Sequence, residues 1–174
     1  HSRESFFPDG ALKEISPSYH IFQTWHVRDA RMLAARYGFP LDASVGSGLA
    51  RHASFLKSVT DGGGETVVLE DGYPVRTAQF LASLGIPSVQ IGGEERAFFP
   101  DTGIAVLRRN GFFLLFDASP FTGRASHYHA GKNAIVLWAR ERPFLVDSGC
   151  CSYDDELFTT WYRLGQAHST LLVN

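Results

Sequence analysis

Long apolar runs and any strong excess of charge are both missing from this chain of 174 residues. No run approaches the roughly 20 apolar residues that a transmembrane helix needs. The 16 Lys and Arg are balanced by 18 Asp and Glu, which gives a net charge of -2. We therefore expect no membrane span, and a composition without a basic excess does not indicate a nucleic-acid partner.

Cysteine is also scarce, since Cys150 and Cys151 are the only two in the sequence. A disulfide scaffold requires many more cysteines, and a disulfide between neighbouring residues is strained. We interpret both as ordinary thiols. Aromatic residues, in contrast, are plentiful, with 14 Phe, 6 Tyr and 3 Trp. Rings in such numbers suit sugar stacking and core packing equally well.

Helical patterns occupy the first half of the chain. Ser16 and Pro17 suit an N-cap and a first helical position, and the helix is expected to end at Tyr37, which a glycine follows. Its apolar residues recur at helical spacing. Residues 48–59 and 75–84 show similar patterns, so the sequence predicts three helices in this half.

The second half of the chain instead shows short apolar runs with turns between them. These runs are residues 104–108, 112–116, 133–139, 144–146 and 170–173. Asn110-Gly111 predicts a two-residue hairpin between the first two runs. Helices followed by antiparallel strands indicate an α+β chain, in which residues 1–90 form a helical portion and residues 91–174 a sheet portion.

Residues suited to metal binding or acid–base chemistry lie beside these runs. His127 and His129 are separated by one residue, so in an extended chain their side chains project to the same face. Imidazole is the commonest metal ligand and the commonest general base near neutral pH. Asp147 and His168 lie at the ends of predicted strands, where a sheet commonly exposes its chemistry. The sequence therefore indicates a metal-binding or acid–base site near His127 and His129.

The order of these motifs resembles the heparinase II/III-type polysaccharide lyases. The similar pieces, in chain order, are Asp9-Gly10 with Glu14-Ile-Ser-Pro-Ser-Tyr19-His20, Phe99-Pro-Asp-Thr-Gly103 with Ala105-Val-Leu-Arg108, His127-Tyr-His129, Leu145-Val-Asp147-Ser-Gly149, and Arg163 followed by Ala167-His-Ser-Thr-Leu-Leu-Val173. In that family an incomplete (α/α) toroid precedes an antiparallel β-sandwich. The resemblance implies a fragment with the last toroid helices and part of the sandwich, and a chain that starts at His1 without Met or signal peptide agrees with a fragment.

The resemblance also implies a bacterial, periplasmic or secreted lyase that cleaves a uronate glycan, such as alginate or a glycosaminoglycan, by β-elimination. This reaction removes the C5 proton and protonates the departing O4, and each proton-transfer group contributes about 10²–10⁴-fold. Tyr19 stands where the family has its catalytic tyrosine. His127 stands where it has a sheet-domain histidine that acts as base or helps to neutralise the substrate. The alternative for Tyr19 is a ring packed in the core beside its helix.

His129, Asp147 and His168 stand where some members of the family bind a divalent metal, often zinc, in a structural or site-organising role. Two imidazoles and one carboxylate make a zinc set with an open fourth position. A simple hairpin, however, would leave His129 roughly 20 Å from Asp147 at about 3.3 Å per residue. Their convergence is therefore implied by the resemblance alone, and the alternative is a turn-capping Asp147 with a hydrogen-bonded core His168.

Four further residues are candidates for binding an anionic polysaccharide or oligosaccharide: His20, Arg124, Lys132 and Arg163. For the basic residues the alternative is a solvated surface charge, and for His20 it is a structural role. Many family members have an Asp two residues after the second His of the His-x-His motif, where this chain has Gly131. The cation that follows, Lys132, puts any role of that Asp in doubt.

Two other classes of protein stay open. Gly123 followed by His127 and His129 is similar to the first motif of cupin-like metal-binding barrels. That motif, however, requires a Glu at a position where this chain has Asn133 or Ala134. The helical first half has no cupin counterpart either. The second class is a non-catalytic glycan-binding protein that keeps the lyase framework, and turnover by the intact protein separates it from an enzyme.

Overall fold

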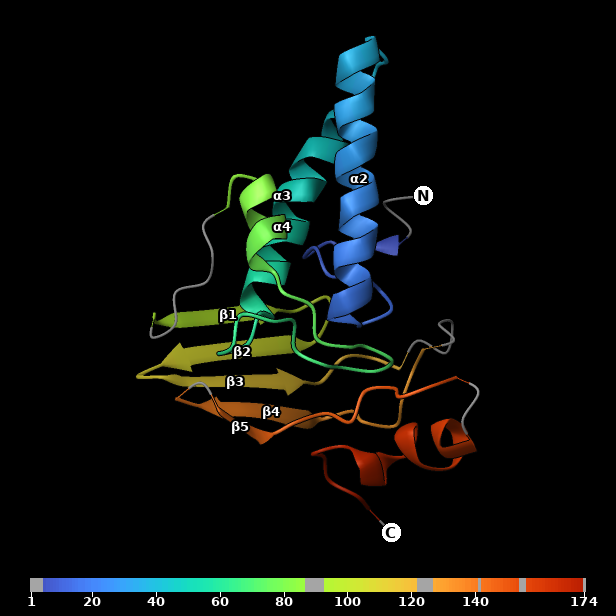
Figure 1. Cartoon of the computed structure of the whole chain (residues 1–174), viewed down its shortest axis with the longest axis vertical. Helices are drawn as coiled ribbons and strands as arrows, with labels where there is room; N and C mark the ends of the chain where they lie inside the picture. Colours follow the sequence, from blue (N-terminus) through green and yellow to red (C-terminus); the bar gives the residue numbers. More distant parts are fainter. Residues whose placement is uncertain (1–4, 87–92, 122–126, 141, 154–155, 174) are drawn as a thin grey trace.

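The computed structural model describes residues 5–86, 93–121, 127–140, 142–153 and 156–173. Within these ranges helices come first and an antiparallel sheet follows, which confirms the α+β class (Figure 1). The helices are α2 (Pro17–Tyr37), α3 (Ala43–Ser58) and α4 (Ala78–Ser83), and the strands are β1 (Glu95–Phe99), β2 (Ile104–Arg109), β3 (Phe112–Asp117), β4 (Ala134–Ala139) and β5 (Arg142–Leu145). A π-helix, η1 (Phe158–Tyr162), and a 3₁₀ turn, η2 (Gly165–Ala167), follow the sheet.

Local signals explain where the helices begin and end. α2 has Pro at its start, and at its end Gly38 takes a left-handed conformation with φ 69°, so the predicted bounds are confirmed. α3 starts five residues earlier than predicted, because the Asp42 side chain accepts a hydrogen bond of 2.7 Å from the backbone N–H of Ser44. α4 is shorter at both ends than the predicted 75–84.

The sheet has the strand order β1-β2-β3-β4-β5, and every neighbouring pair is antiparallel. Asn110 and Gly111 both have positive φ, 52° and 78°, which a two-residue hairpin turn between β2 and β3 requires. The sequence did not predict β1, which pairs Glu95 with Arg108. The predicted strand 170–173 is wrong, because those residues pair with no described strand and Val173 is 95% exposed.

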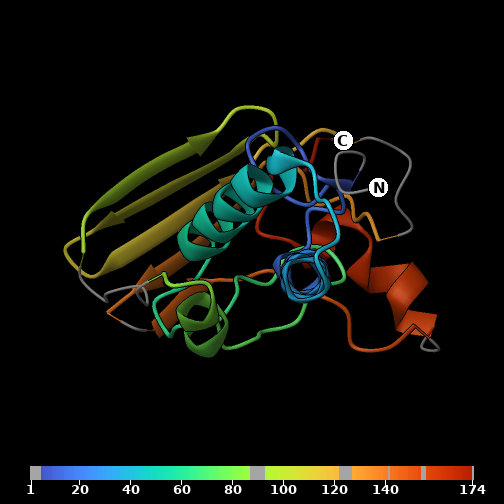
Figure 2. The ribbon, with the colours of Figure 1, turned by 90° about the horizontal axis from the view of Figure 1, so that it is seen from above.

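One hydrophobic core joins the helical portion to the sheet. α3 lies along one face of the sheet (Figure 2), and the Phe55 ring on α3 meets the Phe99 ring on β1 edge-on at 4.9 Å. Buried members of this core from the helical portion are Leu56, Val59, Leu69 and Leu81, and those from the sheet are Ile104, Val106, Phe113, Leu115 and Val136. The proposed boundary between residues 90 and 91 falls outside the described residues, but the parts on either side of it pack together.

The described residues form one sheet, so they supply a single layer of the expected sandwich. Its outward face carries exposed apolar side chains, among them Phe98, Leu107 and Phe112. No described helix is long and apolar enough to cross a lipid bilayer. Both cysteines are free thiols, as interpreted from the sequence.

His20 is a structural residue, which corrects its prediction as a substrate-binding one. Its side chain, on the buried side of α2, is fully buried; Nδ1 accepts a hydrogen bond from the Leu12 N–H at 3.1 Å, and Nε2 donates to the His52 carbonyl at 2.8 Å. Burial lowers the pKa of His20 to about 3, because the site disfavours the charged ring. The neutral imidazole therefore ties α2 to α3.

This pKa makes the fold sensitive to acid. Below its ordinary pKa of 6.5 the unfolded chain binds a proton at His20 that the folded chain does not bind. The free energy of unfolding should therefore fall as the pH drops from about 6.5 towards 3, by at most about 1.4 kcal/mol per pH unit. Urea unfolding of the full-length protein between about pH 7 and about pH 5 measures this slope.

The matched pair of variants for this experiment is His20→Gln and His26→Gln. Both residues lie on α2, but His26 is exposed. The slope should be smaller in His20→Gln and unchanged in His26→Gln. Burial also lowers the pKa of His52, so part of the slope should remain in both variants. Equal slopes in His20→Gln and the wild type would contradict the assignment.

Candidate active site and metal centre

The structure brings Tyr19 and His127 together at the base of α2. Tyr19 lies in the first turn of α2, and His127 precedes β4 on the sheet side. Their rings stack with centroids 4.9 Å apart and an interplanar angle of 23°. Both side chains are partly exposed, so a group from solvent can reach them. The two residues predicted to be catalytic therefore form one pair.

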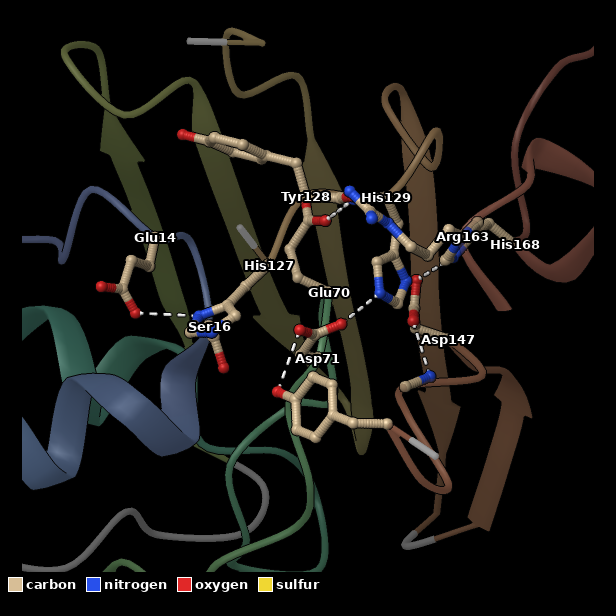
Figure 3. A network of polar contacts seen from close by, with 12 residues as sticks. Glu14, Ser16, Glu70, Asp71, His127, Tyr128, His129, Asp147, Arg163 and His168 are labelled. Carbon is tan, nitrogen blue, oxygen red and sulfur yellow. Dashed lines mark hydrogen bonds and ion pairs between the residues drawn. The ribbon is translucent and has the colours of Figure 1, made fainter. Parts of the chain in front are cut away.

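Glu14 orients the His127 ring. The Nδ1 atom of His127 lies 3.2 Å from Oε2 of Glu14 (Figure 3). Because a carboxylate only accepts hydrogen bonds, Nδ1 is the protonated nitrogen and Nε2 carries the lone pair. A histidine held in this tautomer can accept a proton at Nε2. Glu14 belongs to the motif that carries the resemblance, but no role was predicted for it.

A second tyrosine contacts the Tyr19 hydroxyl. The oxygens of Tyr19 and Tyr153 are 2.7 Å apart, and the Tyr153 hydroxyl donates to Oδ2 of Asp71 at 3.0 Å. Since that bond uses the only hydroxyl proton of Tyr153, Tyr19 is the donor in the bond between the two tyrosines. Burial, followed by the hydrogen bonds to Tyr19 and Asp71, raises the pKa of Tyr153 well above its usual value. Tyr153 thus stays protonated.

His129, Asp147 and His168 also converge. One ligand atom from each lies within 4.8 Å of the other two, and Nδ1 of His168 lies 2.6 Å from Oδ2 of Asp147 (Figure 3). The side chains of His129 and His168 are each 1% exposed and that of Asp147 4%. These are two imidazoles and a carboxylate in a buried position, as the resemblance implied.

Two features bring His129 close to Asp147, although a simple hairpin would leave these two residues far apart. The chain turns before β4, where Asn133 has a positive φ of 60°, so His129 does not continue the line of the strand. The His129 N–H donates to the Glu70 carboxylate, which holds this segment against the loop before α4. A Cβ at Gly131 would lie 2.6 Å from Cγ of His168. A glycine at position 131 therefore leaves the space that the His168 ring occupies.

The donor atoms fit a metal ion. Nε2 of His129 lies 2.5 Å from Oδ1 of Asp71, to which it donates, so Nδ1 carries the lone pair. That Nδ1 atom is buried and has no hydrogen-bond partner among the described residues. A histidine whose far nitrogen is held by a carboxylate is the usual arrangement of a zinc ligand. Tetrahedral zinc with an open fourth position is the metal that two imidazoles and one carboxylate suit best.

The contact between His168 and Asp147 also changes the pKa of His168. Burial lowers that pKa, but the hydrogen bond and the charge of Asp147 raise it more, so it lies above its ordinary value. In the absence of a metal, the raised pKa of His168 favours a hydrogen-bonded ion pair with Asp147. This hydrogen-bonded pair is the alternative to a metal centre at the same residues.

The predicted basic substrate ligands have structural partners instead. Lys132 binds the Glu70 carboxylate and lies 3.0 Å from Oγ of Ser119, and its side chain is only 19% exposed. Arg163 donates from Nε and Nη2 to the Tyr128 carbonyl at 3.1 and 3.0 Å. Both cations thus hold the segment that carries the histidines, and their role as substrate ligands stays a prediction. Arg124 lies outside the described residues.

Comparisons with known proteins agree with this architecture. The chain superimposes on heparinase III with a TM-score of 0.84 at 18% identity, covering 99% of this chain and 33% of that one. It superimposes on the heparan sulfate lyase HepC from Pedobacter heparinus with a TM-score of 0.80 at 21% identity, covering 98% of this chain and 31% of that one. The chain thus has the fold of a part of these lyases and spans about a third of their length.

The likeness to these structures shows that the chain has the fold of a part of heparinase-like proteins. A family model described as "Heparinase II/III-like, C-terminal" matches residues 91–174, so the sheet portion of the chain is similar to that family. A comparison with curated protein sequences gave no match.

Proposed function

We propose that the full-length protein is a lyase that cleaves a uronic-acid-containing polysaccharide or oligosaccharide by β-elimination. The observation that carries this proposal is the Tyr19–His127 pair, with centroids 4.9 Å apart at a partly exposed position between the helices and the sheet. The two proton transfers of the reaction act on adjacent carbons of one sugar ring, so the groups that perform them must lie this close together.

Each side chain has a distinct role in the proposed reaction. His127 takes the C5 proton at Nε2, since its Nδ1 is held by Glu14. The electron pair of the C5–H bond forms the C4–C5 double bond as the C4–O4 bond breaks. Tyr19 donates its hydroxyl proton to the departing O4. The Glu14 carboxylate then stabilises the imidazolium that His127 has become.

We further propose that His129, Asp147 and His168 hold a divalent metal, with zinc as the best fit. A zinc ion bound there supplies positive charge that fixes its three ligands in place. The protein residues alone perform the proton transfers, because Tyr19 and His127 are not among the three ligands. A periplasmic or secreted location goes with this function, as an anionic glycan is an extracellular polymer.

The test is turnover by the full-length protein on heparan sulfate, chondroitin sulfate, hyaluronan and alginate. Each elimination creates a 4,5-unsaturated uronate, whose ultraviolet absorbance should rise with time on at least one substrate. Binding should be measured on the same panel. A protein that binds one of these glycans without producing the unsaturated product is a non-catalytic glycan-binding protein, and the proposal is then wrong.

A further inference from the structure

The candidate active site and the candidate metal centre share one carboxylate, that of Asp71. Its Oδ2 accepts from the Tyr153 hydroxyl at 3.0 Å, and its Oδ1 lies 2.5 Å from Nε2 of His129, which donates to it. Tyr153 in turn lies 2.7 Å from Tyr19. A continuous line of hydrogen bonds therefore runs from the proposed catalytic tyrosine to a proposed metal ligand. No sequence motif marked Asp71 or Tyr153 for this role.

Burial makes this carboxylate a rigid link. The side chain of Asp71 is completely buried, and its two oxygens each have a different donor. A buried carboxylate that lost either donor would be left with an unsatisfied charge, which disfavours any movement of one donor without the other. The orientations of the His129 ring and the Tyr153 hydroxyl are therefore linked.

The segment 147–153 strengthens the link, because it contributes to both sites. Asp147 at its start is a proposed metal ligand, and Tyr153 at its end contacts Tyr19. Between them Gly149 lies directly on the loop of Asp71, where a Cβ at Gly149 would be 2.7 Å from the carbonyl oxygen of Gly72. A metal that holds Asp147 and His129 thus fixes this segment from both sides.

We propose that Asp71 is a positioning residue that couples the metal centre to the orientation of Tyr19, through His129 on one side and Tyr153 on the other. The inference rests on the proposed function, since it takes Tyr19 as catalytic and His129 as a ligand. With the Tyr153 proton committed to Asp71, the Tyr153 oxygen accepts from Tyr19 and holds the Tyr19 oxygen in place until its proton turns towards the departing O4. Metal binding stabilises this arrangement, and by linkage the arrangement favours metal binding.

The first measurement needs no turnover. Zinc has no absorbance of its own because its d shell is full. Adding zinc to the metal-free full-length protein should nevertheless give a near-ultraviolet tyrosine difference spectrum, since zinc bound to His129 makes its Nε2–H a stronger donor to Asp71 and so alters the strength of the hydrogen bond that Tyr153 donates to the same carboxylate. The spectrum should be lost in Tyr153→Phe and kept in Tyr37→Phe, a matched control at the exposed far end of α2. A spectrum that is absent in the wild type, or unchanged in Tyr153→Phe, overturns the coupling.

The second measurement compares zinc affinity with steady-state kinetics. Asp71→Asn should weaken zinc binding by about 10–100-fold, as loss of a carboxylate behind a ligating histidine does. At saturating zinc it should still lower kcat by more than it raises KM, because Tyr19 has lost its fixed orientation. Tyr153→Phe should lower kcat in the same way, and the double variant should be no slower than Asp71→Asn alone.

Two results separate the coupling from a structural role and from the proposed function. Full kcat in Asp71→Asn at saturating zinc, or additive effects of the two variants, overturns the coupling while the lyase proposal stands. A wild type that binds zinc but turns over no substrate refutes the lyase proposal, and the difference spectrum then decides the coupling. If Asp71→Asn does not fold, Tyr153→Phe decides it alone, since this variant keeps the buried carboxylate and its bond to His129.

Discussion

Replacing Tyr19 by Phe in the full-length protein is expected to lower kcat by at least about 100-fold on the true substrate. The substitution removes the hydroxyl that protonates O4 and keeps the ring that stacks on His127 at 4.9 Å. The free energy of unfolding should change little, by about 1 kcal/mol, because one hydrogen bond to Tyr153 is lost at a partly exposed position. Steady-state kinetics and urea unfolding of the same preparations measure the two effects.

Tyr37→Phe is the matched control for this variant. Tyr37 lies on the same helix, and its side chain is 65% exposed at the end away from the sheet. Its loss of a hydroxyl should leave both kcat and the free energy of unfolding near the wild-type values. Near-normal turnover by Tyr19→Phe would show that Tyr19 is a packing aromatic, and the proposed mechanism would then be wrong.

Local signals in the sequence account for the elements that were predicted well. The bounds of α2 follow from Pro17 and Gly38, and the hairpin between β2 and β3 follows from Asn110-Gly111, because each of these residues restricts its own backbone. Elements without such signals were not found. β1 is a charged edge strand whose partner β2 fixes it. Residues 170–173 are mostly apolar, but they form no strand.

The residues of the candidate site also fall into those that short motifs predicted and those that only the structure revealed. The positions of Tyr19, His127 and the three proposed metal ligands came from the resemblance, since their motifs are short and ordered along the chain. Their partners came only from the structure. Glu14 lies 113 residues from His127 in the sequence and Asp71 lies 58 residues from His129. Contacts across such separations depend on how the helical and sheet portions pack, which no local pattern encodes.

Zinc should stabilise the full-length protein, and replacement of His129 by Ala should abolish that stabilisation. A ligand that binds only the folded state adds about 2.7 kcal/mol to the free energy of unfolding at 100 times its Kd and about 4.1 kcal/mol at 1,000 times its Kd. The zinc-dependent shift in Tm, measured between saturating zinc and excess chelator, reports this term. The difference within each variant is the quantity to compare, because His129→Ala also deprives the buried Asp71 of a donor.

His127→Ala is the matched control for the metal prediction. It removes the same type of side chain two positions earlier, from a histidine that binds Glu14 and is not a member of the His129–Asp147–His168 group. The wild type and His127→Ala should show equal shifts in Tm with zinc, and His129→Ala should show none. If zinc and chelator give the same Tm in the wild type, His168 and Asp147 form a hydrogen-bonded structural pair, because the raised pKa of His168 favours that ion pair without any metal.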